Sequence, residues 1–134
     1  MVFSYSCKKK SNYNPHKLSS VPYSESVQVG DMLYISGQIG NTEDNYSEVV
    51  PGGIKPQVHQ VMKNIKKILS KHNAGMEDLV KCTCILVNAD DWGEMSEIYI
   101  QYFNHNKPAR TTIGGAELPM GALVEIDCIA RLNN

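Results

Sequence analysis

No stretch of the 134-residue sequence approaches the roughly 20 consecutive apolar side chains of a membrane-spanning helix, so no membrane association is predicted. The first residues, MVFSYSCKKK, lack the apolar stretch of a secretory signal. Serines are frequent before Glu25 and acidic residues are absent there, as in an organellar transit segment, but arginine is absent too. We therefore expect a cytoplasmic protein, with organellar targeting as the alternative.

A strong charge of one sign, internal repeats and low-complexity segments are also absent. The formal net charge of −1 gives no general attraction to nucleic acid, so a nucleic-acid partner is not expected. An apolar content of 42% excludes wholesale disorder. The length is typical of one domain, and we predict a single domain over residues 1–134.

The spacings typical of metal and redox sites are missing as well. No C-x-x-C occurs, and we interpret the cysteines as small buried side chains in a reducing compartment: Cys7, Cys82, Cys84 and Cys128. The histidines do not cluster at ligand spacing, and no Lys-Ser follows Gly114-Gly115 as it would in a phosphate loop. These absences predict no metal site and no phosphate-binding loop.

Regular patterns predict strands and helices in alternation. A hairpin is expected from 27–29 to 32–36 around Gly30-Asp31, followed by a loop over 41–46. Apolar residues at helical spacing from Ile54 to Leu69 predict a long helix with Pro56 in its first turn and lysines on its opposite face. A solvated helix face is the interpretation of those lysines, and a nucleic-acid patch is the alternative.

The second half continues the alternation. Strands are predicted over 79–87, 109–113 and 122–130. A second helix should begin at Asp91, with Asp91 and Glu94 in a capping-box arrangement. Its apolar stripe is interpreted as core packing: Trp92, Met95, Ile98, Tyr99 and Phe103. The order predicts an α+β fold with a mixed sheet of about six strands and two helices on one face.

Two opposite charges on predicted strands are the best candidates for chemistry. Arg110 follows Pro108-Ala109, and Glu125 lies inside the last strand. Charges on largely buried strands are costly unless they are paired or used. A guanidinium can bind a carboxylate bidentately, and a carboxylate can orient water or move a proton. A structural salt bridge between the two strands is the alternative. The apolar residues beside Glu125, such as Leu123 and Ile129, suggest that a second copy of the chain covers that sheet face.

Several segments in order, from about Ser20 to the end, resemble the reactive intermediate deaminase family (RidA or YjgF, also called endoribonuclease L-PSP). They are PYS at 22–24, LYISGQIG at 33–40, GGIKPQVHQVMKNI at 52–65, DLVKCTCIL at 78–86, EIYIQYF at 97–103, PAR at 108–110, LP at 118–119 and VEIDCIA at 124–130. The resemblance implies a chorismate-mutase-like fold and a homotrimer with sites at the subunit interfaces. It also implies hydrolysis of 2-imino acids such as 2-iminobutanoate and 2-iminopropanoate, or their enamine tautomers, to 2-oxo acids and ammonia, without a cofactor.

The resemblance also implies roles for individual residues. Arg110 would bind the substrate carboxylate and Glu125 would hold the attacking water. Tyr23, Ser36 and Gly37 would line the pocket, and glycine would let backbone approach the ligand closely. Ser96 stands where many members have asparagine, and Thr112 where many have cysteine, so these two substrate-binding positions could change the substrate preference. The alternatives are an endoribonuclease or translation inhibitor acting on single-stranded RNA, and a non-enzymatic trimer that binds small carboxylates.

Overall fold

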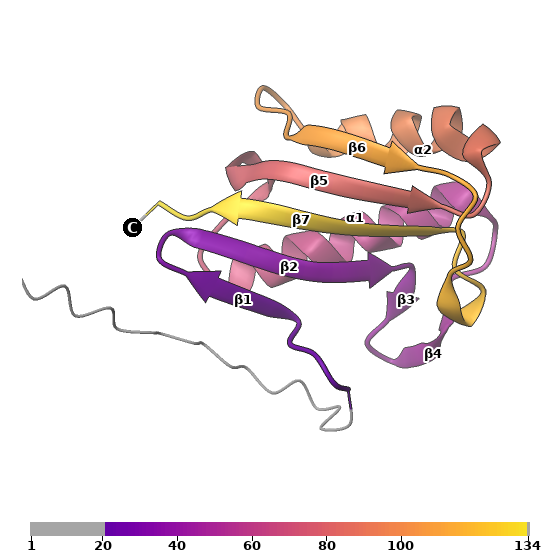
Figure 1. Cartoon of the computed structure of the whole chain (residues 1–134), viewed down its shortest axis with the longest axis horizontal. Coiled ribbons are helices and arrows are strands. Elements are labelled where there is room, and N and C mark those ends of the chain that lie inside the picture. Colours follow the sequence, from indigo (N-terminus) through magenta and orange to yellow (C-terminus); the bar gives the residue numbers. More distant parts are fainter. Residues whose placement is uncertain (1–20, 134) are drawn as a thin grey trace, which may run out of the picture.

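The computed structural model describes residues 21–133, which form a mixed sheet with two main helices. The sheet has five strands in the order β1-β2-β7-β5-β6, and all neighbours are antiparallel except the parallel pair β5 and β6. Figure 1 shows the strands side by side, with the last strand of the chain at the centre of the sheet. The strands are β1 (Ser26–Val29), β2 (Met32–Ile39), β5 (Leu79–Leu86), β6 (Ala109–Ile113) and β7 (Val124–Arg131).

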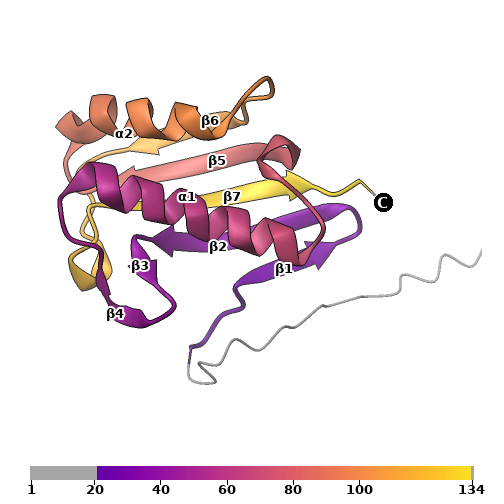
Figure 2. The same ribbon diagram turned by 180° about the vertical axis from the view of Figure 1, so that it is seen from behind.

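Both helices, α1 (Ile54–Lys71) and α2 (Trp92–Tyr99), cover the same face of this sheet (Figure 2). The core lies between them and the sheet, where every second residue of β5 and β7 is buried. The apolar side of α1 supplies much of this core, because residues at helical spacing face the sheet together: Ile54, Val58, Val61, Met62, Ile65, Ile68 and Leu69. The other sheet face carries no helix among the described residues, and it faces the viewer in Figure 1. The predicted α+β class and the placement of both helices on one face are confirmed.

Within residues 21–133 the main sheet has five strands instead of the expected six or so, and a separate two-stranded ribbon lies at one end, made of β3 (Asn41–Thr42) and β4 (Asn45–Val49). This ribbon occupies most of the segment that was predicted to be a loop. Its sequence, NTEDNYSEV, is too polar to give a strand pattern, because the ribbon buries none of its residues fully.

The start of α2 also differs from the prediction. Asp91 is the N-cap residue, but its side chain makes no capping hydrogen bond. A short 3-10 turn over Ala89–Asp91 comes first, and the Asn88 side chain accepts a hydrogen bond from the Asp90 amide, 3.0 Å long. The side-chain cap is therefore Asn88, one turn earlier. Asn and Asp side chains can both accept a hydrogen bond from the backbone amide two residues on.

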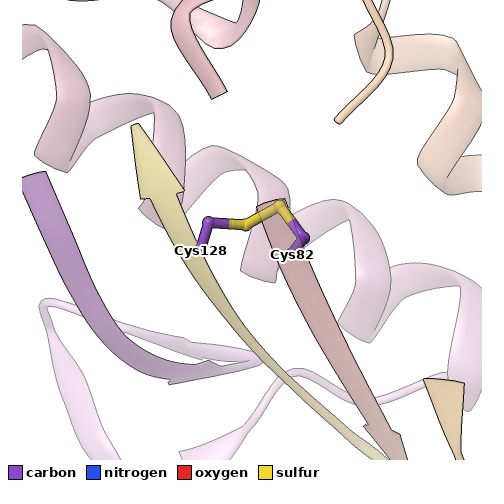
Figure 3. The surroundings of a disulfide bond; sticks show 2 residues. All are labelled: Cys82 and Cys128. Atoms are coloured by element: carbon purple, nitrogen blue, oxygen red, sulfur yellow. A yellow bond between two sulfur atoms is a disulfide. The ribbon is translucent and has the colours of Figure 1, made fainter. Parts of the chain in front are cut away.

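Two of the cysteines form a disulfide, contrary to the expectation of separate reduced side chains. Cys82 on β5 and Cys128 on β7 are register partners on the helix-covered face, with Cα atoms 4.1 Å apart, and their sulfurs are bonded (Figure 3). The sequence alone could not predict this disulfide, because it depends on the register between two strands whose cysteines are 46 positions apart. Cys84 is a free, buried thiol, and Cys7 lies outside the described residues, as does the segment compared with a transit peptide.

The lysines of α1 are exposed, as predicted, and three of the five pair with glutamates, including Lys55 with Glu97 on α2. Lys71 contacts Glu25 with a nitrogen–oxygen distance of 2.8 Å, and Lys67 contacts Glu43. Acidic partners reduce the positive potential that binding to phosphates requires, which favours the solvated-face interpretation. In the described part of the chain, no helix is long and apolar enough to cross a membrane.

A buried glutamine on α1 fixes the segment that leads into β7. The Gln57 side chain, which is 4% exposed, accepts a hydrogen bond of 2.8 Å from the backbone amide of Leu123. Gln57→Leu keeps the volume but leaves that amide unpaired, so we expect unfolding to need about 1–3 kcal/mol less free energy. Chemical denaturation measures this loss. Gln60→Ala on the half-buried flank of the same helix is the control, and equal losses in the two variants would contradict the role of Gln57.

Candidate active site

Arg110 is held on the helix-covered side of the edge strand β6. Its register partner on β5 is the buried Cys82, and parallel partners point to the same face. One guanidinium nitrogen donates a 3.1 Å hydrogen bond to the Ser96 hydroxyl, and the other lies 3.9 Å from the Met95 sulfur. The guanidinium carbon is 5.5 Å from the centre of the Trp92 ring and 5.0 Å from that of Tyr99. These are cation–π distances.

All four contacts come from one face of α2. Residues 92, 95, 96 and 99 lie at helical spacing, so the helix presents them together to Arg110. The interpretation of the stripe as core packing is therefore incomplete. Met95 and Tyr99 are buried, but Trp92 is 53% exposed and lies beside the guanidinium. Ser96, a polar residue inside an apolar stripe, was the sequence signal that this face meets a charge.

The groups around Arg110 are uncharged side chains: Thr112 on β6, the buried Cys84 on β5 and the buried Tyr99 on α2. Thr112 lies two residues along β6 on the same face and pairs in register with Cys84. Burial raises the pKa of the Cys84 thiol to about 11, so the thiol stays protonated at neutral pH. The buried Tyr99 hydroxyl has no hydrogen-bond partner in residues 21–133. Burial also raises the pKa of Tyr99. Within residues 21–133, Arg110 thus has no charged side chain in contact.

Glu125 lies on the opposite face of the sheet, close to the backbone of Gly37. Its register partners are Ile39 on β2 and Ile85 on β5. The register of β2 against β7 shifts between Ile35 and Gln38, so Ser36 and Gly37 together oppose one residue of β7. A Cβ added to Gly37 would overlap the Glu125 carboxylate and lie 2.8 Å from its Cδ. Glycine at this bulge therefore makes room for the carboxylate.

Ser36 lies at the bulge beside Glu125, and Tyr23 lies in the segment that is hydrogen-bonded to this bulge. The Ser36 hydroxyl donates a 2.6 Å hydrogen bond to the carbonyl of Ser24, and the Ser36 amide donates one of 3.0 Å to the carbonyl of Glu25. These hydrogen bonds connect the segment before β1 to the bulge in β2. Tyr23 directly precedes the two bonded residues, and its side chain is 62% exposed. A tyrosine so open to solvent is available to a ligand or to another protein surface.

The predicted site residues thus fall into two groups on opposite faces of one sheet. We call Arg110, Ser96 and Thr112 the arginine group, and Tyr23, Ser36, Gly37 and Glu125 the glutamate group. The register puts Arg110 beside Cys82 on the helix side, whereas Glu125 lies beside Ile85 on the open side. A salt bridge between Arg110 and Glu125 within one chain, the alternative suggested by the sequence, is therefore wrong.

Burial makes the Glu125 carboxylate harder to ionise. Desolvation raises the pKa of Glu125 above its ordinary value, and the negative charge of Asp127 raises it further. Within residues 21–133 the Glu125 carboxylate has neither a hydrogen-bond donor nor a cation in contact. Such a group costs folding free energy when it is ionised, which is typical of residues kept for function.

This cost predicts a stability gain in Glu125→Gln. A raised folded-state pKa contributes to the free energy of unfolding. This stabilisation is present in full below the unfolded-state pKa and is lost as pH rises through the folded-state pKa. At pH 7 the variant should therefore unfold at a higher denaturant concentration than the wild type. The difference should shrink towards pH 4. Denaturation at both pH values and at one protein concentration measures it, with the exposed Glu117→Gln as control. A gain that grows as the pH falls would contradict the assignment.

Neither group has the composition of a metal site. Within residues 21–133 no three His, Cys, Asp or Glu side chains lie together in a way that could hold a metal ion. The arginine group offers hydrogen-bond donors, and the glutamate group offers one carboxylate among apolar and hydroxyl side chains. The donors of the first group suit an anion, and the carboxylate of the second suits water or a proton.

Comparisons with known proteins agree on one family. The family model described as endoribonuclease L-PSP matches residues 15–132. The 2-iminobutanoate/2-iminopropanoate deaminase of Mus musculus is 40% identical over 109 residues, which cover 81% of this chain and 80% of that protein. The crystal structure of yeast Mmf1 has a TM-score of 0.80 at 32% identity, covering 85% of this chain and 90% of that one. E. coli TdcF with bound serine has a TM-score of 0.78 at 28% identity, covering 84% and 90%.

The chain belongs to the endoribonuclease L-PSP family, also known as the reactive intermediate deaminase (RidA/YjgF) family. The match extends over nearly the whole of the described structure and includes both residue groups.

Proposed function

We propose that this protein hydrolyses reactive 2-imino acids, or their enamine tautomers, to 2-oxo acids and ammonia. One observation carries the proposal. Arg110 is a partly buried cation, rigidly held by α2, with no carboxylate in contact anywhere in residues 21–133. A desolvated, unpaired charge is costly, so a site that keeps one is suited to a ligand of opposite charge.

The chemistry of relatives narrows this anion to a small carboxylate. TdcF binds serine, whose α-carboxylate resembles that of a 2-imino acid, and the mouse relative is named for imino acid deamination. The guanidinium has five N–H donors, of which the contacts with Ser96 and Met95 occupy two. Enough donors remain for a bidentate grip on a carboxylate.

The two residue groups form one site only if two copies of the chain meet. Arg110 and Glu125 lie on opposite faces of the same sheet, so one copy must present its arginine group to the glutamate group of the next. The helix-free sheet face supports this arrangement. It carries half-buried or exposed apolar side chains that another copy would cover: Tyr34, Ile85, Ile113 and Ile129. Leu123, which was expected on this face, precedes β7 and packs against the core instead. We propose a cyclic homotrimer, in which each contact between neighbours would make one site.

The reaction then needs little beyond positioning. Arg110 fixes the carboxylate, which places the adjacent C=N carbon opposite Glu125 of the next copy. Glu125 accepts a proton from water while the water oxygen bonds to that carbon and the C=N electron pair moves to nitrogen. Glu125 returns that proton to the nitrogen, which gives a neutral carbinolamine. The carbinolamine collapses when its hydroxyl proton passes to the nitrogen, the C–N bond breaks and the oxygen electron pair forms C=O, so the 2-oxo acid and ammonia are released and Glu125 is again a carboxylate. Glu125 is suited to carry these protons, because its raised pKa lies nearer to neutrality.

An imine supplied in solution tests the proposal directly. An amino-acid oxidase generates 2-imino acids from the amino acids, and semicarbazide traps the imine that remains. The protein should accelerate release of 2-oxo acid and ammonia and lower the trapped imine. Equal amounts of semicarbazone with and without the protein, across several amino acids, would refute the deaminase proposal. Binding of 2-oxo acids without turnover would point to the non-enzymatic carboxylate-binding alternative.

Gly37→Ala tests the placement of Glu125 without touching its charge. The added methyl group would overlap the Glu125 carboxylate, so the Glu125 side chain must move. A shift of about 1 Å at a reacting group lowers kcat/KM by about 10–100-fold, while the fold should survive because a flexible side-chain end can give way. Gly93→Ala on α2 is the matched control, because no atom beyond its chain neighbours and the backbone of its own helix lies within 4 Å of the added Cβ. Full activity in Gly37→Ala would show that Glu125 need not occupy this position.

A further inference from the structure

A second acidic residue lies next to Glu125 on the same open sheet face. Asp127 follows Glu125 by two positions on β7, and side chains two apart on a strand point to the same side. Its register partner on β5 is Thr83, and on β2 it faces the bulge formed by Ser36 and Gly37. Asp127 makes no hydrogen bond or ion pair within residues 21–133. It is therefore an uncompensated, half-buried carboxylate beside another.

We propose that Asp127 is a positioning residue for proton transfer that acts through Glu125, because the two carboxylates lie two positions apart on the same face of β7 and next to the bulge at Ser36 and Gly37. The inference rests on the proposed function. It adds a residue whose effect passes through Glu125, since Asp127 lies one strand repeat away from the water-holding carboxylate. Two neighbouring carboxylates that resist simultaneous ionisation are a common way to match a proton donor and acceptor to its task.

Within residues 21–133 of the same chain, no other charge on this face is placed to cancel the effect. Lys81 on β5 is the nearest cation by register, beside Ile129, and its ammonium group donates a 2.6 Å hydrogen bond to Thr111 on the next strand. Arg131 lies at the far end of β7 and pairs with Asp31 at 3.1 Å. Tyr34 on β2 is opposite Ile129. The facing residues of β1 and β6 carry no charge: Val27, Val29, Ala109, Thr111 and Ile113.

The direction of the effect follows from electrostatics. Asp127 and burial both raise the pKa of Glu125, with burial the larger cause. Removing the Asp127 charge leaves the burial in place and lowers the proton affinity of Glu125. In the proposed assembly, Arg110 of the neighbouring copy also faces Glu125 and acts in the opposite direction. That contribution is the same in wild type and variants, so it cancels in the comparison.

The test measures Glu125 itself as well as the reaction. Carbon-detected NMR follows the Glu125 carboxyl through a pH titration, with Glu125→Gln identifying its signal. In Asp127→Asn we expect the titration midpoint of Glu125 to fall by about half a pH unit or more, from Coulomb's law across one strand repeat. The acid limb of the pH profile of kcat/KM should move to lower pH by the same amount. Asp127→Glu keeps the charge and should restore the wild-type midpoint. Asp127→Thr, which suits a strand, is a second charge-removing variant.

Outcomes for this inference and for the proposed function are distinguishable. An unchanged Glu125 midpoint in folded Asp127→Asn and Asp127→Thr overturns the role of Asp127, whether or not the protein turns over imines. A lowered midpoint with an unshifted acid limb also overturns it, because the charge would then not act on the reaction. A wild-type protein without imine turnover refutes the proposed function and, with it, the catalytic part of this inference.

Discussion

Mixing two inactive variants, Arg110→Ala and Glu125→Gln, is expected to restore activity. Each homo-oligomer lacks one half of every site. In mixed assemblies, an Arg110→Ala copy still carries Glu125, and a Glu125→Gln copy still carries Arg110. Wherever these intact halves meet across an interface, a complete site forms. Random mixing in a cyclic assembly gives about a quarter of the sites both intact groups, so activity should approach about a quarter of the wild-type value.

The same mixture separates a shared site from a site within one chain. The chains are mixed by denaturation and joint refolding, and native mass spectrometry verifies that hybrids form. Wild type mixed with the double variant is the control. It should show about a quarter of the activity for a shared site but about half for a site within one chain. Hybrids of the two single variants that remain inactive would contradict the two-copy site. That result would conflict with the placement of the two residues on opposite sheet faces.

Replacing Arg110 by alanine is expected to lower kcat/KM for 2-imino acids by about 10²–10³-fold. Loss of one partner from a desolvated charge pair typically costs about 2–5 kcal/mol, or roughly 30–5,000-fold, and the expected loss lies in the middle of that range. Lysine should not rescue the activity fully, because its ammonium is a point charge and cannot reproduce the planar fork that grips both carboxylate oxygens. Steady-state kinetics with oxidase-generated imines measures the loss, and calorimetric titration with a 2-oxo acid shows whether carboxylate binding is lost in parallel.

Arg131→Ala is the control for this prediction. Arg131 pairs with Asp31 at the surface, and such pairs contribute little to stability. We expect its kcat/KM to remain within about twofold of the wild type. If Arg110→Ala kept the full rate while Arg131→Ala lost it, the carboxylate-binding role would belong to the other arginine. Thermal melting of both variants excludes a simple loss of the folded state.

The elements with strong local patterns were predictable because their periodicity records which side is buried. The strand at 109–113 matches β6 (Ala109–Ile113), and the apolar spacing from Ile54 to Leu69 predicted α1 within a few residues. The β1–β2 hairpin followed from Gly30-Asp31 at its turn, where Gly30 has a φ of 62°. The β3–β4 ribbon was missed because its side chains bury too little to leave a pattern.

The site could be predicted as a set of residues but not as an arrangement. Arg110 and Glu125 stood out because charges on half-buried strands need a reason. Trp92 and Tyr99 were assigned to the core, because helical spacing alone cannot tell a ring that packs against leucine from one that packs against a guanidinium. Their contact with Arg110 depends on α2 lying over β6, which is a long-range contact.

The sequence by itself determined the α+β class, the helices and most strands, the family blocks and the two charged candidates. Only the tertiary structure decided that Arg110 and Glu125 lie on opposite faces of the sheet, that Gly37 makes room for the carboxylate, and that Cys82 and Cys128 are bonded. The physical reason is strand register. Shifting one strand by a single residue exchanges the two faces, and the register is fixed by packing between distant segments rather than by the residues of either strand alone.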